Sequence, residues 1–272
     1  MRPIAITKYA QECWNALQNI PDVKEKTKVA YQQLRKTGNP DVSIVIPAYN
    51  EEENIVQTLY SLCQNITTKA VEIIVVNNNS KDNTANLVDA CGVTCILETK
   101  QGITNARNAG LAKATGTYVL NADADSIYPM YWVEEMVKPF DNDAHVCSVY
   151  GRFSFIPVGN TGRLMYFFYE YIADFMRWIN KHIKDEAVNV YGFNSGFRRE
   201  QGLQVDGFNH PPYANEDGWL ALKLRNKGFG KLYYVTNIKA LVWTTDRRIQ
   251  IDGGIVKATI RRIKRMFFKG ER

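Results

Sequence analysis

The sequence predicts an α/β fold with a mostly parallel central sheet and helices on both faces. Short runs of β-branched and other apolar residues alternate with helical segments of roughly ten residues. These runs are apolar almost throughout, as expected for strands that are buried on both faces. With 272 residues, the chain is also long enough to bury a substantial interior.

The predicted elements alternate regularly in the first half of the chain. Apolar runs indicate strands at 42–46, 71–76, 94–98 and 117–120, and helical spacing indicates helices at 51–63, 84–91 and 103–114. In this interpretation Pro47 ends the first strand. Two further helices, at 9–17 and 23–35, would form a helical extension over residues 1–40.

The pattern loosens in the second half of the chain. Helices are expected at 129–139, 164–179 and 215–227, one or two strands within 145–155, and further strands at 231–235 and 240–244. Asn215 is placed to cap the helix that begins there. Residues 254–268 resemble a basic amphipathic helix, in which apolar residues alternate with lysines and arginines.

Composition excludes several classes of protein. The net charge of +6 is mild and selects no partner by itself. The five cysteines include no Cys-x-x-Cys pair and the three histidines have no zinc-site spacing, so we expect free thiols in a reducing compartment. The first residues lack the apolar core of a signal peptide, and no apolar run reaches about 18 residues, which argues against an integral membrane protein.

Two carboxylates stand one residue apart, at Asp123 and Asp125, directly after the predicted strand at 117–120. At the carboxyl end of a parallel strand they would lie over the crevice where open α/β sheets bind ligands. Because two close carboxylates repel each other, the pattern favours a divalent cation beside them. An acidic loop in solvent is the alternative, since so short a pattern also arises by chance.

Several segments occur in an order typical of one enzyme family. They are SIVIPAYNE (43–51), IIVVNNNS (73–80), GITNARNAG (102–110), DAD (123–125), NSG (194–196) and ED (216–217). Together they resemble the family 2 glycosyltransferases of GT-A fold, over about residues 42–248. The resemblance implies an inverting transferase that uses a nucleotide-diphospho-sugar and a divalent metal, Mg²⁺ or Mn²⁺.

On the donor side, the resemblance places Pro47, Tyr49 and Glu51 at the nucleotide end of the first strand. Asn78 stands where the family usually carries an aspartate that binds the base. This is a departure, but an amide can both donate and accept, so a UDP-sugar still fits while the base stays open.

The metal and the diphosphate also have implied residues. Arg107 would reach the ribose or the diphosphate, Asp123 would lie near the ribose and metal, and Asp125 would coordinate the metal directly. Arg247 or Arg248 would close over the diphosphate. From the residues alone, Arg107 could equally be a solvent-facing helix charge, and the later arginines a surface pair.

On the acceptor side, Asp217 matches the family's catalytic base and Glu216 lies beside it. Burial and a neighbouring carboxylate would raise the pKa of Asp217 toward a useful value. The alternative is that both residues only place negative charge at the N-terminus of a helix.

These features predict a metal-dependent, inverting glycosyltransferase for cell-surface polysaccharide or glycoconjugate synthesis. Its acceptor would be a hydroxyl of a glycan or of a lipid-linked molecule. Residues 41–250 would form the catalytic domain, with a nucleotide-sugar half (41–126) and an acceptor half (127–250), and 251–272 a basic C-terminal helix. A polyprenyl-phosphate glycosyltransferase and a non-catalytic nucleotide-sugar binding protein are the alternatives.

The expected location is cytoplasmic, at the inner face of the membrane, if the basic C-terminal helix lies on anionic lipid. Its alternative is a helix docked on the protein with a solvated basic face. A nucleic-acid partner is not expected, because the basic residues gather in the tail and form no groove-sized patch.

Overall fold

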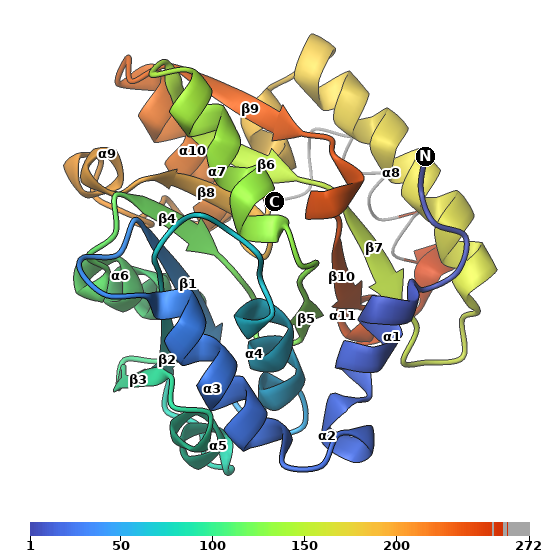
Figure 1. Ribbon diagram of the computed structural model, residues 1–272. Coiled ribbons are helices and arrows are strands. Elements are labelled where there is room, and N and C mark those ends of the chain that lie inside the picture. Colours follow the sequence, from blue (N-terminus) through green and yellow to red (C-terminus); the bar gives the residue numbers. More distant parts are fainter. Residues whose placement is uncertain (252, 258–259, 261–272) are drawn as a thin grey trace.

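The computed structural model describes residues 1–251, 253–257 and 260. In this part of the chain a seven-stranded sheet forms the centre of the molecule (Figure 1). In spatial order its strands are β3 (Thr94–Leu97), β2 (Val71–Asn77), β1 (Val42–Ala48), β4 (Tyr118–Asn121), β8 (Ser195–Arg198), β6 (Val146–Gly151) and β9 (Lys231–Val235). Only β8 runs antiparallel to its neighbours among these strands, which confirms the predicted, mostly parallel α/β fold.

A second, small sheet joins distant segments beside the first one. Its strands are β5 (Ser126–Ile127), β10 (Val242–Thr245) and β7 (Phe153–Ile156), with β10 in the middle. Asp125 immediately precedes β5, and Arg247 lies two residues beyond the end of β10. The pairing of these two strands therefore brings the two halves of the chain together next to Asp125.

Alternating residues of the central strands pack into two apolar layers. Ile44 and Ile46 of β1 belong to the layer that includes residues of α3 (Val23–Arg35), α4 (Ile55–Cys63), α5 (Thr84–Ala90) and α7 (Trp132–Asn142). Val45 belongs to the opposite layer, with residues of α6 (Ile103–Lys113) and α10 (Glu216–Asn226). This alternation places helices on both faces of the sheet.

The N-terminal helices pack on the body of the protein. In α3, Val23, Tyr31 and Leu34 are buried in the same layer as β1, and the Tyr31 hydroxyl accepts the N–H of Ile73 at 3.0 Å. Further toward the N-terminus, α1 (Lys8–Trp14) packs its buried residues against the small sheet, and α2 (Ala16–Asn19) follows.

The first strand does not end at Pro47, as the sequence predicted, but continues to Ala48. Val45 accepts the N–H of Ala122 in β4's extension, and Ala48 accepts the N–H of Asn78 on the β2 side. Because successive residues point to opposite sides, the nitrogen of Pro47 faces the β4 side, where the ladder has its last pair at Val45 and Asn121. The missing N–H of proline therefore costs β1 none of its observed ladder bonds.

Other boundaries in the second half also differ from the prediction. The run at 145–155 divides into β6 and β7, which belong to different sheets. The helix α8 (Arg163–Ile183) is longer than expected, and Pro139 lies inside α7. The elements that were not predicted include β5, β8, α9 (Arg199–Gln204), α11 (Arg247–Ile251) and the 3-10 helices η1 (Glu186–Asn189) and η2 (Ile238–Ala240).

Most of the predicted basic helix at 254–268 lies outside the described residues. Within the described part of the chain, no helix combines the length and apolar character needed to cross a bilayer.

Candidate active site

The candidate site lies at the carboxyl ends of β1 and β4. The chain moves from β1 outward to β2 and β3, then returns to the other side of β1 with β4, so the strand order changes direction between them. In open α/β sheets, such a switch point leaves a crevice where ligands bind. Asp123 follows β4 at this crevice.

A buried arginine joins the two halves of the predicted site. Arg107 on α6 is 2% exposed, and its Nη2 donates to Asp123 Oδ1 at 3.0 Å. On its other side, Arg107 Nε lies 3.3 Å from Oδ1 of Asp217 in the first turn of α10. Arg107 Nε and Nη1 and Asp217 Oδ1 are buried without a hydrogen-bond partner. These atoms are therefore available to hydrogen-bond a ligand or to exchange partners.

Gly192 allows Arg107 and Asp217 to lie close to each other, and it was not among the predicted site residues. A Cβ added to Gly192 would overlap the guanidinium of Arg107 and lie 2.5 Å from Asp217 Oδ2. The backbone of Gly192 also forms a hydrogen bond with the Asp217 carboxylate. The one signal in the sequence is a glycine two residues before the NSG segment.

The carboxylates at the site are harder to ionise than usual. Burial, with the nearby charges of Glu216 and Asp123, raises the pKa of Asp217 to about 7 in spite of the opposing effect of Arg107. Burial also raises the pKa of Asp123, and burial together with Asp123 raises the pKa of Asp125. One buried guanidinium therefore does not balance the carboxylates around it.

The start of α10 fixes Asp217 in place. Asn215 caps the helix as predicted, since its side-chain oxygen accepts the N–H groups of Asp217 and Gly218, each at 3.0 Å. Asp217 is 5% exposed, so its role is not limited to a solvated charge at a helix end. Glu216, beside it, is partly exposed.

A second group of charges surrounds Asp125. The Thr245 hydroxyl donates to Asp125 Oδ2 at 2.8 Å, and Arg247 Nη2 lies 3.1 Å from the same oxygen. Arg247 also donates to both oxygens of Glu51, with Nη2 at 2.5 Å from Oε1 and Nη1 at 3.2 Å from Oε2. The structure thus brings the predicted residues Glu51, Asp125 and Arg247 together. Thr245 adds a hydrogen-bond donor that was not predicted.

These residues fit a divalent metal that shares its coordination with a ligand. Asp123 and Asp125 supply hard oxygen atoms, and burial raises the pKa of both carboxyls, so a bound cation would favour their ionised forms. Among the described residues, no group of three or more His, Cys, Asp or Glu side chains could hold a metal alone. Mg²⁺ is commonly held by one or two carboxylates plus substrate phosphates, and this residue set matches that pattern.

The remaining donor-side residues lie in the loops after β1 and β2. Tyr49 is 47% exposed, whereas the side chain of Asn78 is buried and fully engaged. Asn78 Nδ2 donates to the carbonyls of Glu98 and Lys100, and its Oδ1 accepts the N–H of Gly102 at 2.7 Å. Asn78 therefore orders its loop, and base recognition by it stays a prediction. A pocket of about 360 Å³ lies between these loops, lined by Asn50, Glu52, Glu53, Asn54, Lys81, Asp82 and Arg247.

Comparison with known proteins gives a family match. The model for glycosyl transferase family 2 matches residues 43–201, which is more than half of the chain. The probable glycosyltransferase YdaM of Bacillus subtilis is 29% identical over 226 residues, covering 78% of this chain and 50% of that protein.

Two relatives with more specific names match shorter segments. The poly-beta-1,6-N-acetyl-D-glucosamine synthase of Staphylococcus epidermidis is 33% identical over 108 residues, which is 36% of this chain and 26% of that protein. The undecaprenyl-phosphate 4-deoxy-4-formamido-L-arabinose transferase of Serratia proteamaculans is 32% identical over 107 residues, again 36% of this chain and 32% of its own length. The chain thus spans half or less of the length of these curated relatives.

Solved structures share the fold at low sequence identity. The mannosyltransferase of Pyrobaculum calidifontis, in complex with GDP-Man and Mn²⁺, aligns with a TM-score of 0.58 at 21% identity, covering 96% of this chain and 76% of that one. TarS of S. aureus, in complex with UDP, also has a TM-score of 0.58, at 17% identity, covering 75% of this chain and 60% of that one.

Proposed function

Since the chain belongs to glycosyl transferase family 2, we propose that it transfers a sugar from a nucleotide-diphospho-sugar to an acceptor hydroxyl, with inversion at the anomeric carbon. The acceptor is a glycan or a lipid-linked molecule in cell-surface polysaccharide or glycoconjugate synthesis. The observation that carries the proposal is the buried Asp217, whose pKa of about 7 suits a general base near neutral pH.

Asp217 acts on the acceptor. As the acceptor oxygen attacks the anomeric carbon, its proton passes to the Asp217 carboxylate, and the bond to the diphosphate breaks on the opposite face. Arg107, at 3.3 Å, holds this carboxylate in position and links it to Asp123 on the donor side. Glu216 acts through charge, because it helps to raise the pKa of Asp217.

Asp123 and Asp125 act on the donor. They would hold Mg²⁺ or Mn²⁺ together with oxygens of the diphosphate, and a bound metal would supply positive charge for the leaving group. The nucleoside lies between the loops after β1 and β2, near Pro47, Tyr49, Glu51 and Asn78. UDP and GDP-Man are present in complexes of proteins with this fold, and we favour a UDP-sugar.

Arg247 changes partners in this proposal. In the structure its guanidinium pairs with Glu51 and Asp125. When the donor binds, the guanidinium turns to the diphosphate, for which a planar fork of donors is well suited. We accordingly assign residues 41–126 to the donor, 127–250 to the acceptor and 1–40 to a helical extension.

The proposed location is the cytoplasm. The five cysteines are free in the structure, which supports a reducing compartment and hence a cytoplasmic site of action. The basic residues at 251–272 support contact with the inner face of a membrane.

The test measures nucleotide release with a panel of nucleotide sugars in the presence of Mn²⁺. We expect Asp217→Asn to lower kcat by roughly 10²–10⁴-fold and Asp125→Ala to remove the metal dependence together with most activity. Asp22→Asn is the matched control, because Asp22 lies in the left-handed region that asparagine tolerates, far from the site. Wild-type rates in both site variants would refute the assignment.

A phosphate acceptor is the second candidate, favoured by the similarity to an undecaprenyl-phosphate transferase. A phosphate is already ionised and needs no base. An inactive Asp125→Ala with an unaffected Asp217→Asn would establish this alternative. Nucleotide binding by calorimetry without transfer to any acceptor would instead indicate a binding protein.

A further inference from the structure

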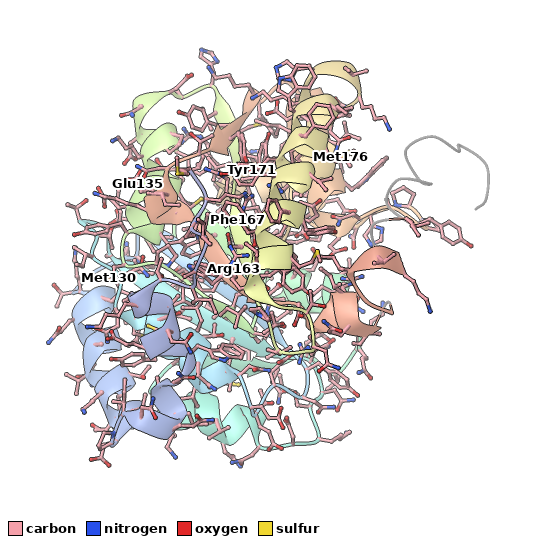
Figure 2. All side chains as sticks on the ribbon, turned by 90° about the vertical axis from the view of Figure 1, so that its right-hand side faces the viewer. Met130, Glu135, Arg163, Phe167, Tyr171 and Met176 are labelled. Carbon is pink, nitrogen blue, oxygen red and sulfur yellow. The ribbon has the colours of Figure 1, made fainter. Side chains whose placement is uncertain are left out.

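The helix α8 has its apolar side on the outside of the protein. Seven of its large apolar side chains are between 42% and 60% exposed, namely Leu164, Met165, Phe168, Tyr171, Ile172, Phe175 and Trp178. Figure 2 looks onto this helix, with Arg163, Phe167, Tyr171 and Met176 marking its successive turns. An exposed apolar stripe that extends over about four turns is unusual on a soluble surface.

The inward side of α8 carries charge instead. Glu170 is 1% exposed and pairs with Arg2 and Arg163, at 3.3 and 2.7 Å. One turn further, Asp174 pairs with Arg2 at 2.6 Å, with Arg152 at 3.3 Å, and with Arg177. Tyr166, Tyr169 and Ala173 are buried on the same side, so α8 has apolar residues on both sides, and its outward side is far more apolar than that of an ordinary surface helix.

The charges that remain on the outside of α8 are positive. From Arg163 to Lys184, no aspartate or glutamate is in the exposed class, because Glu170 and Asp174 point inward. Lys181 and Lys184 are exposed at the C-terminal end, Lys181 also pairing with Glu186 at 3.0 Å. Trp178 stacks on His182 beside them. If a second copy of the protein packed on this face, its α8 would present no exposed carboxylate to pair with these lysines.

We propose that α8 lies flat on an anionic lipid bilayer, with its aromatic side in the boundary between headgroups and acyl chains. Tryptophan, tyrosine and phenylalanine on one side, with lysines at the edge, are the composition that such interfacial helices require. Anionic headgroups complement the lysines. This attachment is separate from the proposed sugar transfer, and it differs from an anchor in the C-terminal residues.

The docked helix is connected to the candidate active site. The 3-10 helix η1 lies between α8 and α10, with Asn189 Nδ2 donating to the carbonyl of Arg177 at 2.9 Å. On the other side, a Cβ on Gly218 would lie 2.8 Å from the Ala187 carbonyl oxygen, so α10 packs closely on η1. Membrane contact through α8 would therefore hold Asp217 at a set distance from the lipid surface.

Vesicle flotation of the full chain tests the proposal. We expect binding to vesicles of phosphatidylcholine with about a third phosphatidylglycerol, and weaker binding to phosphatidylcholine alone. Phe168→Ser/Phe175→Ser should lower the partition coefficient by about tenfold or more, since two buried aromatic contacts are lost. The control Leu97→Ser/Tyr233→Ser changes two exposed apolar residues elsewhere and should have no effect.

Fluorescence gives a second measurement. Trp178 is the one tryptophan of five in the exposed class, so lipids brominated on their acyl chains should quench it. Trp178→Phe should lose this quenching while the protein still binds vesicles. Thermal unfolding of each variant checks that the fold is retained.

Two results would overturn the proposal. The first is binding that survives in Phe168→Ser/Phe175→Ser but is lost in Arg261→Glu/Arg262→Glu, which would assign the anchor to the tail. The second is no binding to either vesicle, together with a dimer in sedimentation that the Phe168→Ser/Phe175→Ser variant dissociates, which would assign α8 to a second copy.

Discussion

Two buried groups of arginines and carboxylates stand in different parts of the molecule with opposite charge balance. Around Glu170 and Asp174, four arginines surround two carboxylates, and these ion pairs hold the pKa of Asp174 well below its usual range despite burial. At the candidate site, Arg107 alone faces Asp123 and Asp217, and both carboxyl pKa values are raised.

The difference in charge balance separates a group that stabilises the fold from a group that can react. A carboxylate with surplus arginines is locked in its ionised form and can only hold elements together. A carboxylate with too few cations accepts a proton or a further cation, as a general base or a metal ligand must. The ratio of charges, more than burial alone, therefore distinguishes the two groups.

Removing the arginine that links Asp123 to Asp217 should have the largest effect. In Arg107→Met these two carboxylates lose their shared buried cation, so the pKa of both carboxyls would rise further and Asp217 would lose its orientation. We expect kcat/KM to fall about 100-fold or more, measured by nucleotide release. Arg163→Met is the control, because Arg2 still pairs with Glu170, and its kcat/KM should stay within about twofold. Equal losses in both variants would contradict the comparison.

Breaking the arginine-rich group should affect stability and not catalysis. Glu170→Gln leaves Arg163 without its buried counter-charge and leaves Arg2 with Asp174 alone, and we expect the free energy of unfolding in urea to fall by about 3–5 kcal/mol. The exposed pair of Lys8 and Glu12 offers a matched control, where Glu12→Gln should cost about 0.5 kcal/mol or less. A large loss of kcat per folded molecule in Glu170→Gln would show that this group also serves the reaction.

A smaller effect on kcat/KM is expected when Gly192, which touches Arg107 and Asp217, is replaced by alanine. In Gly192→Ala the new methyl group displaces Arg107 and Asp217 from their present contact. We expect kcat/KM to fall about tenfold, with little change in donor binding measured by calorimetry. Gly162→Ala, where a Cβ meets open space, should retain normal kcat/KM.

The smallest effect is the response to pH. Since Asp217 must be ionised to accept a proton and its pKa is about 7, kcat/KM should be half-maximal near that pH and fall about tenfold per unit below it.

The same raised pKa also affects stability. The contribution of Asp217 to the free energy of unfolding is full below its unfolded pKa of about 3.9 and is lost as the pH rises through its folded pKa. Asp174, whose pKa is lowered, acts oppositely and loses its contribution only in strong acid. A flat kcat/KM profile would favour a phosphate acceptor.

Local patterns were sufficient to predict the first half of the fold. The strands β1 to β4 and the helices between them depend on the spacing of apolar residues within short windows, which the sequence displays directly. The cap at Asn215 was predictable for the same reason, since its partners are two and three residues away. The motifs also led to Asp123, Asp125 and Asp217.

What could not be predicted depends on contacts between distant residues. The strand β8 has four residues and exists because β4 and β6 pair with it on either side. Arg107 has the pattern of any helix cation, and only the approach of Asp217, more than a hundred residues later, makes it a buried link. The composition of α8 predicted a helix, but which side faces inward is decided by Arg2 and Arg152, which lie outside it.

At the crevice, the hydrogen-bond ladder between β1 and β4 lacks one bond for a covalent reason. After the last pair, Val45 with Asn121, the next ladder bond would run from the nitrogen of residue 47 to the carbonyl of Ala122. Proline has no hydrogen there, so this bond cannot form at any temperature or pH, or with any ligand. The gap in the ladder beside Asp123 therefore persists in every state of the protein that keeps these two strands.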